Sequence, residues 1–271
     1  MPRPHEARAP VHDRIPGWQG VGLTHQGLVR AANQDACAVL NDHRLWVVAD
    51  GMGGHAGGEV ASRLTVAAWE AEAGTIADGR SATHEELARR LNAATVQAHQ
   101  AVRQEAARTP ALAGMGTTLV ALHIVPAGNP YGPPYAAVAH VGDSRAYLAR
   151  AGGIHALTRD HSWVEEQLAK GLLSTQEALA HPYRHVLTRA IGIDEQSTPD
   201  IGIVSLEPRD RLLLCTDGLT KMLSDDEIAG ILAASPQRGE QVCSALVQAA
   251  LDRGGVDNVT VILVWHESTG R

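Results

Sequence analysis

The sequence contains no Phe, and aromatic residues make up only 3% of its 271 residues. A core of this size must therefore be built mainly from Val, Leu, Ile and Ala. Hydrophobic residues account for 44% and charged residues for 20%, as in an ordinary globular protein. A chain of this length can bury a full hydrophobic core.

Cysteine is scarce as well. The sequence has three, Cys37, Cys215 and Cys243, which lie far apart and form no CxxC pair. This pattern favours buried, reduced thiols in a protein of the cytoplasm. A Cys-x5-Arg motif is also missing, so a covalent cysteine mechanism has no candidate nucleophile.

Clusters of basic residues and long apolar segments are missing too. The formal net charge is −7, and no Lys/Arg run is present, which argues against a nucleic-acid surface. No segment approaches the length of a membrane span. Residues 1–16 are rich in Pro, Arg and His but have no apolar stretch, which indicates a disordered leader and not a signal peptide. We expect a cytoplasmic monomer without nucleic-acid or membrane partners.

The remaining sequence, residues 17–267, is predicted to form one domain of the α+β class. Strands predicted at 36–40 and 45–49 are joined by turn residues, as in a hairpin, and another strand is predicted at 117–125. Capping boxes at Thr83-His84-Glu85-Glu86, Ser174-Thr175-Gln176-Glu177 and Ser224-Asp225-Asp226-Glu227 predict helix starts. Paired strands and grouped helices favour antiparallel sheets covered by helices. The polar segment of about 160–193 breaks this rhythm and is predicted to be a flap over a site.

Four aspartates occupy similar positions in the sequence. Asp50, Asp143 and Asp217 follow apolar runs that are predicted strands, and Asp257 precedes one. Sheet geometry can bring such positions to one edge, where Asp35 from an early loop could join them. The alternative is that these are unrelated turn or capping residues, a common use of Asp.

Buried carboxylates are costly unless they are paired or bind metal. Only Arg145 lies within two residues of one of these aspartates, so the sequence shows no cation beside each of them. An oxygen-only ligand set favours Mg²⁺ or Mn²⁺ over Zn²⁺. Two such ions would lower the pKa of a bridging water, which suits hydrolysis of a phosphate ester. The fork of Arg30 is the natural candidate to hold the phosphate, although a loop Arg is commonly just solvated.

Six motifs then follow one another along the chain. They are Arg30-x-x-Asn33-Gln34-Asp35, Asp50-Gly51-Met52-Gly53-Gly54-His55, Gly114-Met115-Gly116-Thr117-Thr118, His140-Val141-Gly142-Asp143-Ser144-Arg145, Thr216-Asp217-Gly218-Leu219 and Asp257-Asn258-Val259-Thr260. Together they resemble the signature of the metal-dependent protein phosphatases of type 2C, the PPM family, in its bacterial form. Each motif alone is weak, but six in order, over nearly the whole chain from Trp18 to Trp265, are highly specific.

The resemblance implies an α-β-β-α sandwich of two packed antiparallel sheets with helices outside. It implies that Asp50, Asp217 and Asp257 hold a first Mn²⁺ or Mg²⁺. Asp50 would bridge to a second ion, which also takes the carbonyl of Gly51 and has Asp35 nearby. A third, weaker ion would bind Asp143 and Asp217. Arg30 matches the residue that binds the substrate phosphate, and the flap corresponds to a variable segment thought to influence substrate choice.

Two positions depart from the eukaryotic pattern. Gln34 stands where those members carry a metal-coordinating Glu, so the second ion would rest on Asp35. Met52 stands where they carry a His proposed as general acid, which leaves protonation of the leaving group to a metal-bound water. His161 of the flap is an alternative acid, but we expect it to be a solvated histidine.

These observations predict a protein phosphatase that hydrolyses phosphoserine and phosphothreonine. A hydroxide between two metal ions would attack phosphorus directly, and Arg30 would help to neutralise the phosphoryl oxygens. The partners would be phosphorylated proteins and a cognate Ser/Thr kinase that the enzyme opposes. A binding module that has lost catalysis, or a hydrolase for small phosphates or nucleotides, is the alternative.

Overall fold

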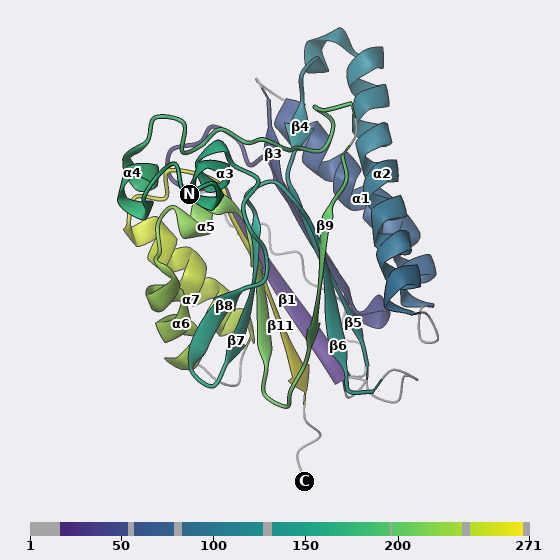
Figure 1. The fold of residues 1–271 in the computed structure, drawn as a ribbon, viewed down its shortest axis with the longest axis vertical. Coiled ribbons are helices and arrows are strands. Elements are labelled where there is room, and N and C mark those ends of the chain that lie inside the picture. Colours follow the sequence, from purple (N-terminus) through teal and green to yellow (C-terminus); the bar gives the residue numbers. More distant parts are fainter. Residues whose placement is uncertain are drawn as a thin grey trace, which may run out of the picture.

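The computed structural model describes residues 17–53, 57–78, 83–126, 132–195, 197–234 and 239–267. Two antiparallel sheets pack face to face, and helices cover the outer face of each (Figure 1). This four-layer arrangement confirms the predicted α-β-β-α sandwich of the α+β class. The predicted leader, residues 1–16, and His55 of the second motif lie outside the described residues.

The first sheet has five strands in the order β1-β11-β10-β7-β8. Its strands are β1 Gly17–His25, β7 Arg145–Arg150, β8 Gly153–Ala156, β10 Arg211–Cys215 and β11 Val259–Glu267. The second sheet has the order β2-β3-β5-β6-β9, with β4 paired to β3. Its strands are β2 Asp35–Leu40, β3 Leu45–Met52, β4 Gly116–Thr117, β5 Leu119–Val125, β6 Tyr135–Val141 and β9 Asp200–Ser205.

Helices α1 and α2 cover the second sheet, and α6 and α7 cover the first (Figure 1). These helices are α1 Gly57–Ala77, α2 His84–Arg108, α6 Asp225–Ala234 and α7 Gly239–Asp252. Shorter helices are α3 Trp163–Ala169 and α4 Thr175–Ala180 of the flap, and α5 Asp217–Thr220. Single 3-10 turns are η1 Asn41–His43 and η3 Pro110–Leu112.

Alternating side chains of the central strands fill the three spaces between the layers. In β3, Leu45, Val47 and Ala49 face the helices α1 and α2, whereas Trp46 and Val48 face the other sheet. Successive side chains of a strand point to opposite faces, and here both faces are buried. Aliphatic residues thus supply most of the core in the absence of Phe.

The helix starts follow the predicted caps. The Thr83 hydroxyl accepts from the backbone N–H of Glu86 at the start of α2, and Ser174 makes a complete capping box with Glu177 at α4. Ser224 and Glu227 exchange the same pair of bonds before α6. The predicted starts are therefore confirmed, although the Glu86 carboxylate binds Arg89 and Arg90 on its own helix.

Three details differ from the prediction. The single strand predicted at 117–125 is divided at Thr118 into β4 and β5, because the Thr118 hydroxyl and N–H bond the Asp50 backbone. Strand β8 was not predicted, and its short, mostly exposed sequence lacks the alternation that marks a strand. Helix α5, only four residues long, is too short to give a periodic signal.

Two buried histidines of the second sheet make the fold sensitive to acid. Burial lowers the pKa of His123 in β5 to about 4 and that of His140 in β6 to about 3. In the unfolded chain both would take up a proton near pH 6.5. At these two positions the unfolded state therefore binds more protons at mildly acidic pH, so the two histidines lower the stability of the fold as the pH falls below about 6.5.

We expect His123→Gln to reduce the loss of unfolding free energy between pH 7 and pH 5 by about 2 kcal/mol, which is the linkage contribution of one such histidine. Denaturant unfolding at both pH values measures it. His155→Gln, at an exposed position of β8, is the matched control and should leave the loss unchanged. Equal losses in wild type and His123→Gln would contradict a neutral, buried His123.

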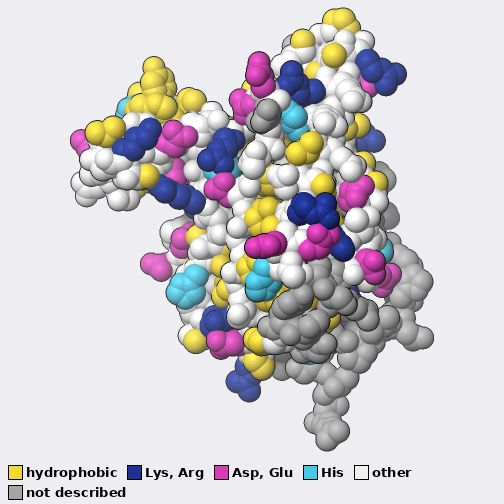
Figure 2. Space-filling model, turned by 45° about the vertical axis from the view of Figure 1, so that its right-hand side comes forward, with side chains coloured by type: hydrophobic (Ala, Val, Ile, Leu, Met, Phe, Trp, Pro, Cys, Tyr) yellow, Lys and Arg dark blue, Asp and Glu magenta, His cyan; other side chains and the backbone are white. Residues whose placement is uncertain are grey.

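No helix in the described part of the chain is long and apolar enough to cross a membrane. Figure 2 shows the molecule turned so that the side with α1 and α2 comes forward. On this face, acidic and basic side chains of the described residues are interspersed and form no patch of one charge. The three cysteines are free, with Cys215 and Cys243 buried as predicted and Cys37 half-buried.

Candidate metal centre

The antiparallel pairing brings all five predicted aspartates to one end of the sandwich. Asp35, at the start of β2, lies directly opposite Asp50 near the end of β3. In the other sheet β10 ends where β11 begins, which places Asp217 and Asp257 at this same end. Asp143 follows β6, whose end lies beside the start of β5. The short helices α3, α4 and α5 gather at this end (Figure 1).

Asp35 is held by two threonines of the opposite sheet. The hydroxyls of Thr216 and Thr260 donate to its Oδ2 at 2.9 and 2.6 Å. Its other oxygen, Oδ1, is buried and has no hydrogen-bond partner in the described structure. Burial raises the pKa of Asp35 to about 7, against the lowering effect of the two hydroxyls. One oxygen is thus fixed in place and the other is left to bind something else.

The backbone of Asp50 is fixed by two further threonines. Its N–H donates to the Thr118 hydroxyl at 2.9 Å, and its carbonyl accepts from the Thr117 hydroxyl at 2.8 Å. Thr118 Oγ1 also lies 2.6 Å from Ser144 Oγ, next to Asp143. One buried hydroxyl therefore links the segments that carry two of the predicted ligands.

The carboxyl groups repel one another. Burial, followed by the charges of Asp35, Asp217 and other aspartates, raises the pKa of Asp50 well above its ordinary value. Burial and the charge of Asp217 raise the pKa of Asp143 to about 7. Bound cations would relieve this repulsion between the carboxylates.

Two cations already lie at the outer edge of the cluster. Lys221 Nζ lies 2.5 Å from Asp217 Oδ2 and 2.9 Å from Asp257 Oδ2. Arg30 pairs with both oxygens of Asp257, Nε to Oδ1 at 2.7 Å and Nη2 to Oδ2 at 2.8 Å. Burial alone would raise the pKa of Asp257, but these hydrogen bonds lower it. The sequence-based view that the cluster lacks compensating cations is therefore wrong for Asp217 and Asp257.

Arg145, the one cation that the sequence placed near an aspartate of the cluster, has another partner. Its guanidinium donates to both oxygens of Asp160, each at 2.8 Å, and to the Tyr147 hydroxyl at 3.0 Å. It therefore anchors the start of the flap and leaves Asp143 without a direct ion pair in the described structure.

The remaining carboxylate oxygens suit a hard divalent cation. Asp35 Oδ1 and Asp217 Oδ1 are buried without a partner in the described structure, and the donor set is oxygen alone. Within the described residues, however, no three His, Cys, Asp or Glu side chains are arranged to hold an ion as they stand. Lys221 lies between two of the carboxylates instead. The residues fit Mg²⁺ or Mn²⁺ chemically, provided that Lys221 moves.

The loop that carries Arg30 is built around Asn258. The amide of Asn258 donates to the carbonyls of Gln26 and Ala32, and its oxygen accepts from the Gln34 N–H. Gly27 has a positive φ of 81°, and a Cβ there would lie 2.2 Å from the Asp257 carbonyl oxygen. The last motif therefore fixes the first: the bond between Gln34 and Asn258 joins residues that are 224 positions apart in the sequence.

A cavity of about 930 Å³ lies between this cluster and the flap. Arg30, Asp143, Asp217 and Asp257 line its inner end, and side chains of α3 and α4 line its outer wall. Arg184 and His185 of the flap also line it, and the charges of Asp217 and Asp257 act on His185. The predicted flap therefore covers the part of the predicted site formed by these four residues. Asp35, Asp50 and Gly51 are not among the described residues that line the cavity.

His161 does not occupy the position expected of it. Its side chain is only 6% exposed, so the expectation of a solvated histidine is wrong. Nδ1 accepts from the Gly142 N–H at 3.1 Å, and Nε2 lies 3.2 Å from Asp200 Oδ2. Burial lowers its pKa. His161 thus fixes the turn before Asp143 and, like Met52, is not among the described residues that line the cavity.

We expect Thr260→Val to weaken Mn²⁺ binding about tenfold, because it removes a hydroxyl that orients Asp35, and loss of such a supporting partner costs 10- to 100-fold in affinity. Isothermal titration calorimetry measures it. Thr65→Val is the control, because Thr65 is buried in α1 and its hydroxyl has no partner in the described structure. Equal affinity in the two variants would show that Asp35 does not depend on Thr260.

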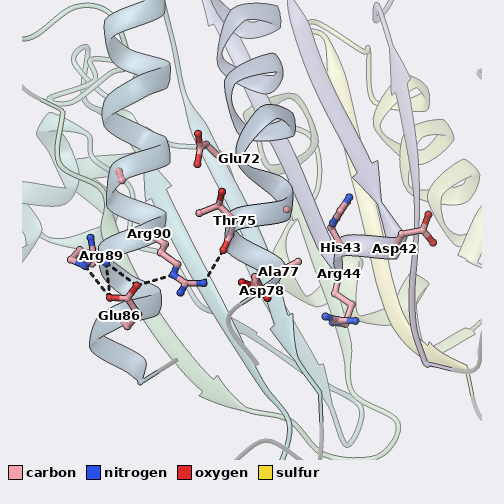
Figure 3. A pocket seen from close by; sticks show the side chains of 12 residues that line it. Asp42, His43, Arg44, Glu72, Thr75, Ala77, Asp78, Glu86, Arg89 and Arg90 are labelled. Atoms are coloured by element: carbon pink, nitrogen blue, oxygen red, sulfur yellow. Dashed lines mark hydrogen bonds and ion pairs between the residues drawn. The ribbon is translucent and has the colours of Figure 1, made fainter. Parts of the chain in front are cut away.

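A second cavity, of about 920 Å³, lies at the opposite end of the sandwich, beside η1 and the end of α1. Three of its charged groups bind one another (Figure 3): Glu86 accepts from both Arg89 and Arg90, and Arg90 also donates to the Thr75 carbonyl at 2.8 Å. We therefore do not take it as the functional site, although it is as large as the first.

Sequence reasoning missed three residues of the site. Lys221 lies four residues after Asp217, the spacing of neighbours on a helix, which is the signal that could have found it. Thr216 and Thr260 belong to two of the six motifs, but their contact with Asp35 could not be predicted, because it joins segments about 180 and 225 residues apart in the sequence.

The chain matches the family model described as Protein phosphatase 2C over residues 22–253. It is 38% identical over 252 residues to the protein phosphatase PhpP of Streptococcus pneumoniae, covering 89% of this chain and 95% of that protein.

Among solved structures, the serine/threonine phosphatase PstP/Ppp of Mycobacterium tuberculosis has a TM-score of 0.81 and 35% identity, covering 93% of this chain and 100% of that one. The catalytic domain of PstP in complex with 2 manganese ions has a TM-score of 0.77 and 33% identity, covering 94% and 100%.

Proposed function

Because the chain belongs to the protein phosphatase 2C family and is a serine/threonine protein phosphatase, we propose that its carboxylate cluster and Arg30 form the active site. The observation that carries this proposal is the cavity in which Arg30 lies beside Asp143, Asp217 and Asp257 under the flap. Acidic oxygens for cations and one guanidinium fork for an anion are the two parts that phosphate-ester hydrolysis needs.

The cofactors of the enzyme are Mn²⁺ or Mg²⁺. In our proposal Asp50, Asp217 and Asp257 hold one ion, and Asp50, the Gly51 carbonyl and Asp35 hold the second. Asp143 and Asp217 would hold a third, weaker ion. When bound, these ions supply a water of lowered pKa as nucleophile and neutralise charge on the phosphoryl oxygens.

Arg30 orients the substrate phosphate. Its guanidinium is half exposed at the rim of the cavity, with 51% of the side chain accessible, and it is held near the carboxylates by Asp257. A planar guanidinium can donate two parallel hydrogen bonds to the oxygens of a phosphate. The loop fixed by Asn258 keeps it within reach, which lowers the entropic cost of orienting the substrate.

The enzyme acts on phosphorylated proteins. We propose that it opposes a cognate Ser/Thr kinase, as a cytoplasmic monomer whose catalytic domain comprises residues 17–267. The volume of the cavity supports a polypeptide substrate, because about 930 Å³ is far more than one phosphate group needs.

The test is the effect of Arg30→Met on binding of the phosphate group. We expect the KM for a phosphothreonine peptide and the inhibition constant of inorganic phosphate to rise together, by about tenfold or more, as for loss of a charge-assisted hydrogen bond. Parallel assays with nucleotides at equal concentration should give far slower turnover than the peptide. An unchanged inhibition constant of phosphate would show that Arg30 does not bind the phosphate group. Equal turnover of nucleotides would favour a small-phosphate hydrolase.

A further inference from the structure

Lys221 is the one ammonium group inside the carboxylate cluster. It directly follows α5, and its side chain is only 26% exposed. Its Nζ lies within hydrogen-bonding distance of Asp217 and Asp257 at once, 2.5 and 2.9 Å away. The same helix turn presents Asp217 and Lys221, so the contact depends on local geometry and not on a mobile loop.

Lys221 and Arg30 together engage both oxygens of Asp257, and Lys221 also holds Asp217 Oδ2, so that of these two residues only Asp217 Oδ1 is left for a cation in the proposed active site. Mg²⁺ binds oxygen ligands at about 2.0–2.1 Å. An ion that bound Asp217 and Asp257 beside Lys221 would lie against the ammonium, and the two positive charges repel each other. Since no oxygen of Asp257 is free while Lys221 and Arg30 stay in place, Lys221 opposes coordination of an ion by both Asp217 and Asp257.

We propose that Lys221 is an internal competitor for the divalent cation, which must leave Asp217 and Asp257 before these residues can bind metal. This inference rests on the proposed function of the cluster. The metal-free enzyme is stabilised by Lys221, because the ammonium offsets the repulsion between the carboxylates. The apparent association constant for metal equals the intrinsic constant multiplied by the fraction of molecules in which Lys221 is already displaced, so a small fraction means weak binding. Lys221 thus sets the Mn²⁺ or Mg²⁺ concentration at which the enzyme becomes active.

Displaced Lys221 would point into the cavity under the flap, which Lys221 also lines. There its ammonium would lie on the substrate side of the carboxylates, in the same cavity as Arg30. Metal binding would thereby add a positive charge to the place where the phosphate group enters.

The first test is a Mn²⁺ titration of Lys221→Met by calorimetry and thermal unfolding. Methionine keeps the length of the side chain but not its charge. We expect the Kd for Mn²⁺ to fall about tenfold and the Tm of the metal-free protein to fall, so that saturating Mn²⁺ raises Tm by more than in wild type. Lys221→Arg, which keeps a competing cation, should bind Mn²⁺ nearly as weakly as wild type.

Loss of any nearby positive charge could also strengthen binding through space. Arg184→Met controls for this, because Arg184 lines the same cavity but makes no ion pair with Asp217 or Asp257 in the described structure. It should change the Kd less than twofold. At high salt a through-space effect would be screened, whereas the effect of Lys221→Met should persist.

Lysine labelling reads the displacement directly. The sequence has only two lysines, Lys170 and Lys221, so that exposed Lys170 is an internal reference. We expect acylation of Lys221, followed by mass spectrometry, to be several-fold faster with Mn²⁺ than with EDTA, at a constant rate for Lys170. If labelling of Lys221 did not depend on Mn²⁺ and Lys221→Met had an unchanged Kd, Lys221 would not compete with the metal. The proposed function would still stand if the enzyme hydrolysed the peptide. If neither wild type nor variant bound Mn²⁺ or hydrolysed the peptide, the proposed function would fall as well.

Discussion

Asp50→Asn is expected to lower kcat/KM for a phosphothreonine peptide by about a thousandfold, roughly 4 kcal/mol of transition-state stabilisation. Asp50 is the aspartate on which the charges of all four others act, and in the proposed site it bridges two ions. An amide of the same shape offers one neutral oxygen and would bind both ions weakly. Steady-state kinetics at saturating Mn²⁺ measures the loss.

The same substitution should stabilise the metal-free protein. The raised pKa of Asp50 means that its ionised form is unfavourable in the folded state, and Asn removes that charge. In EDTA we expect Tm to rise, by about 2–4 °C for each kcal/mol of repulsion removed. An inactive but more stable variant is the signature of a functional residue, since a structural residue would lose both properties.

Asp42→Asn is the matched control for this experiment, because Asp42 lies in the turn at the opposite end of the sandwich. It should change neither activity nor Tm appreciably. Retention of more than a tenth of the activity in Asp50→Asn would show that Asp50 does not hold metal during turnover.

Gly218→Ala is expected to reduce both stability and metal binding. A Cβ at this position, the second residue of α5, would lie 1.9 Å from the Asn258 carbonyl oxygen and 3.4 Å from the Asp257 Cβ. Backbone atoms cannot rotate away, so α5 and the segment before β11 must separate. We expect the unfolding free energy to fall by about 3 kcal/mol, at the upper end of ordinary overpacking, and the Kd for Mn²⁺ to rise about tenfold.

Gly230→Ala is the matched control, and it should raise the stability of the protein. Gly230 lies within α6, and a Cβ there would meet nothing within 4 Å. Alanine is the better helix former, so stability should rise by about 1 kcal/mol. Urea unfolding of both variants tests the pair. If Gly218→Ala were as stable as Gly230→Ala and bound Mn²⁺ normally, close packing of α5 on Asn258 could not be what fixes the ligands.

The sequence predicted the strands and helices well where a local pattern exists. The apolar run before Asp50 became β3, and the capping boxes at Thr83 and Ser174 mark true helix starts. It failed where a feature is short or depends on distant contacts. Helix α5 has too few residues for a period, and the break at Thr118 depends on bonds to Asp50.

The sequence predicted the aspartates that the structure gathers at one end of the sandwich, but not the charge balance around them. A strand-end Asp is visible in any sequence, and a family signature relates several of them. Arg30 was expected to face a phosphate, and in the structure it pairs with Asp257, 227 residues away along the chain. Lys221 was overlooked because a lone lysine is usually solvated. Burial of His161 also had no signal, since it depends on the turn at Gly142.

The central claim is that the carboxylate cluster performs metal-dependent hydrolysis of phosphoproteins. The most direct measurement is hydrolysis of a phosphothreonine peptide by the purified protein, with Mn²⁺ and with EDTA, for wild type and Asp217→Ala. We expect turnover that requires Mn²⁺ and is lost in the variant. Turnover that survives both EDTA and Asp217→Ala would contradict the account, because it would place the chemistry outside this cluster.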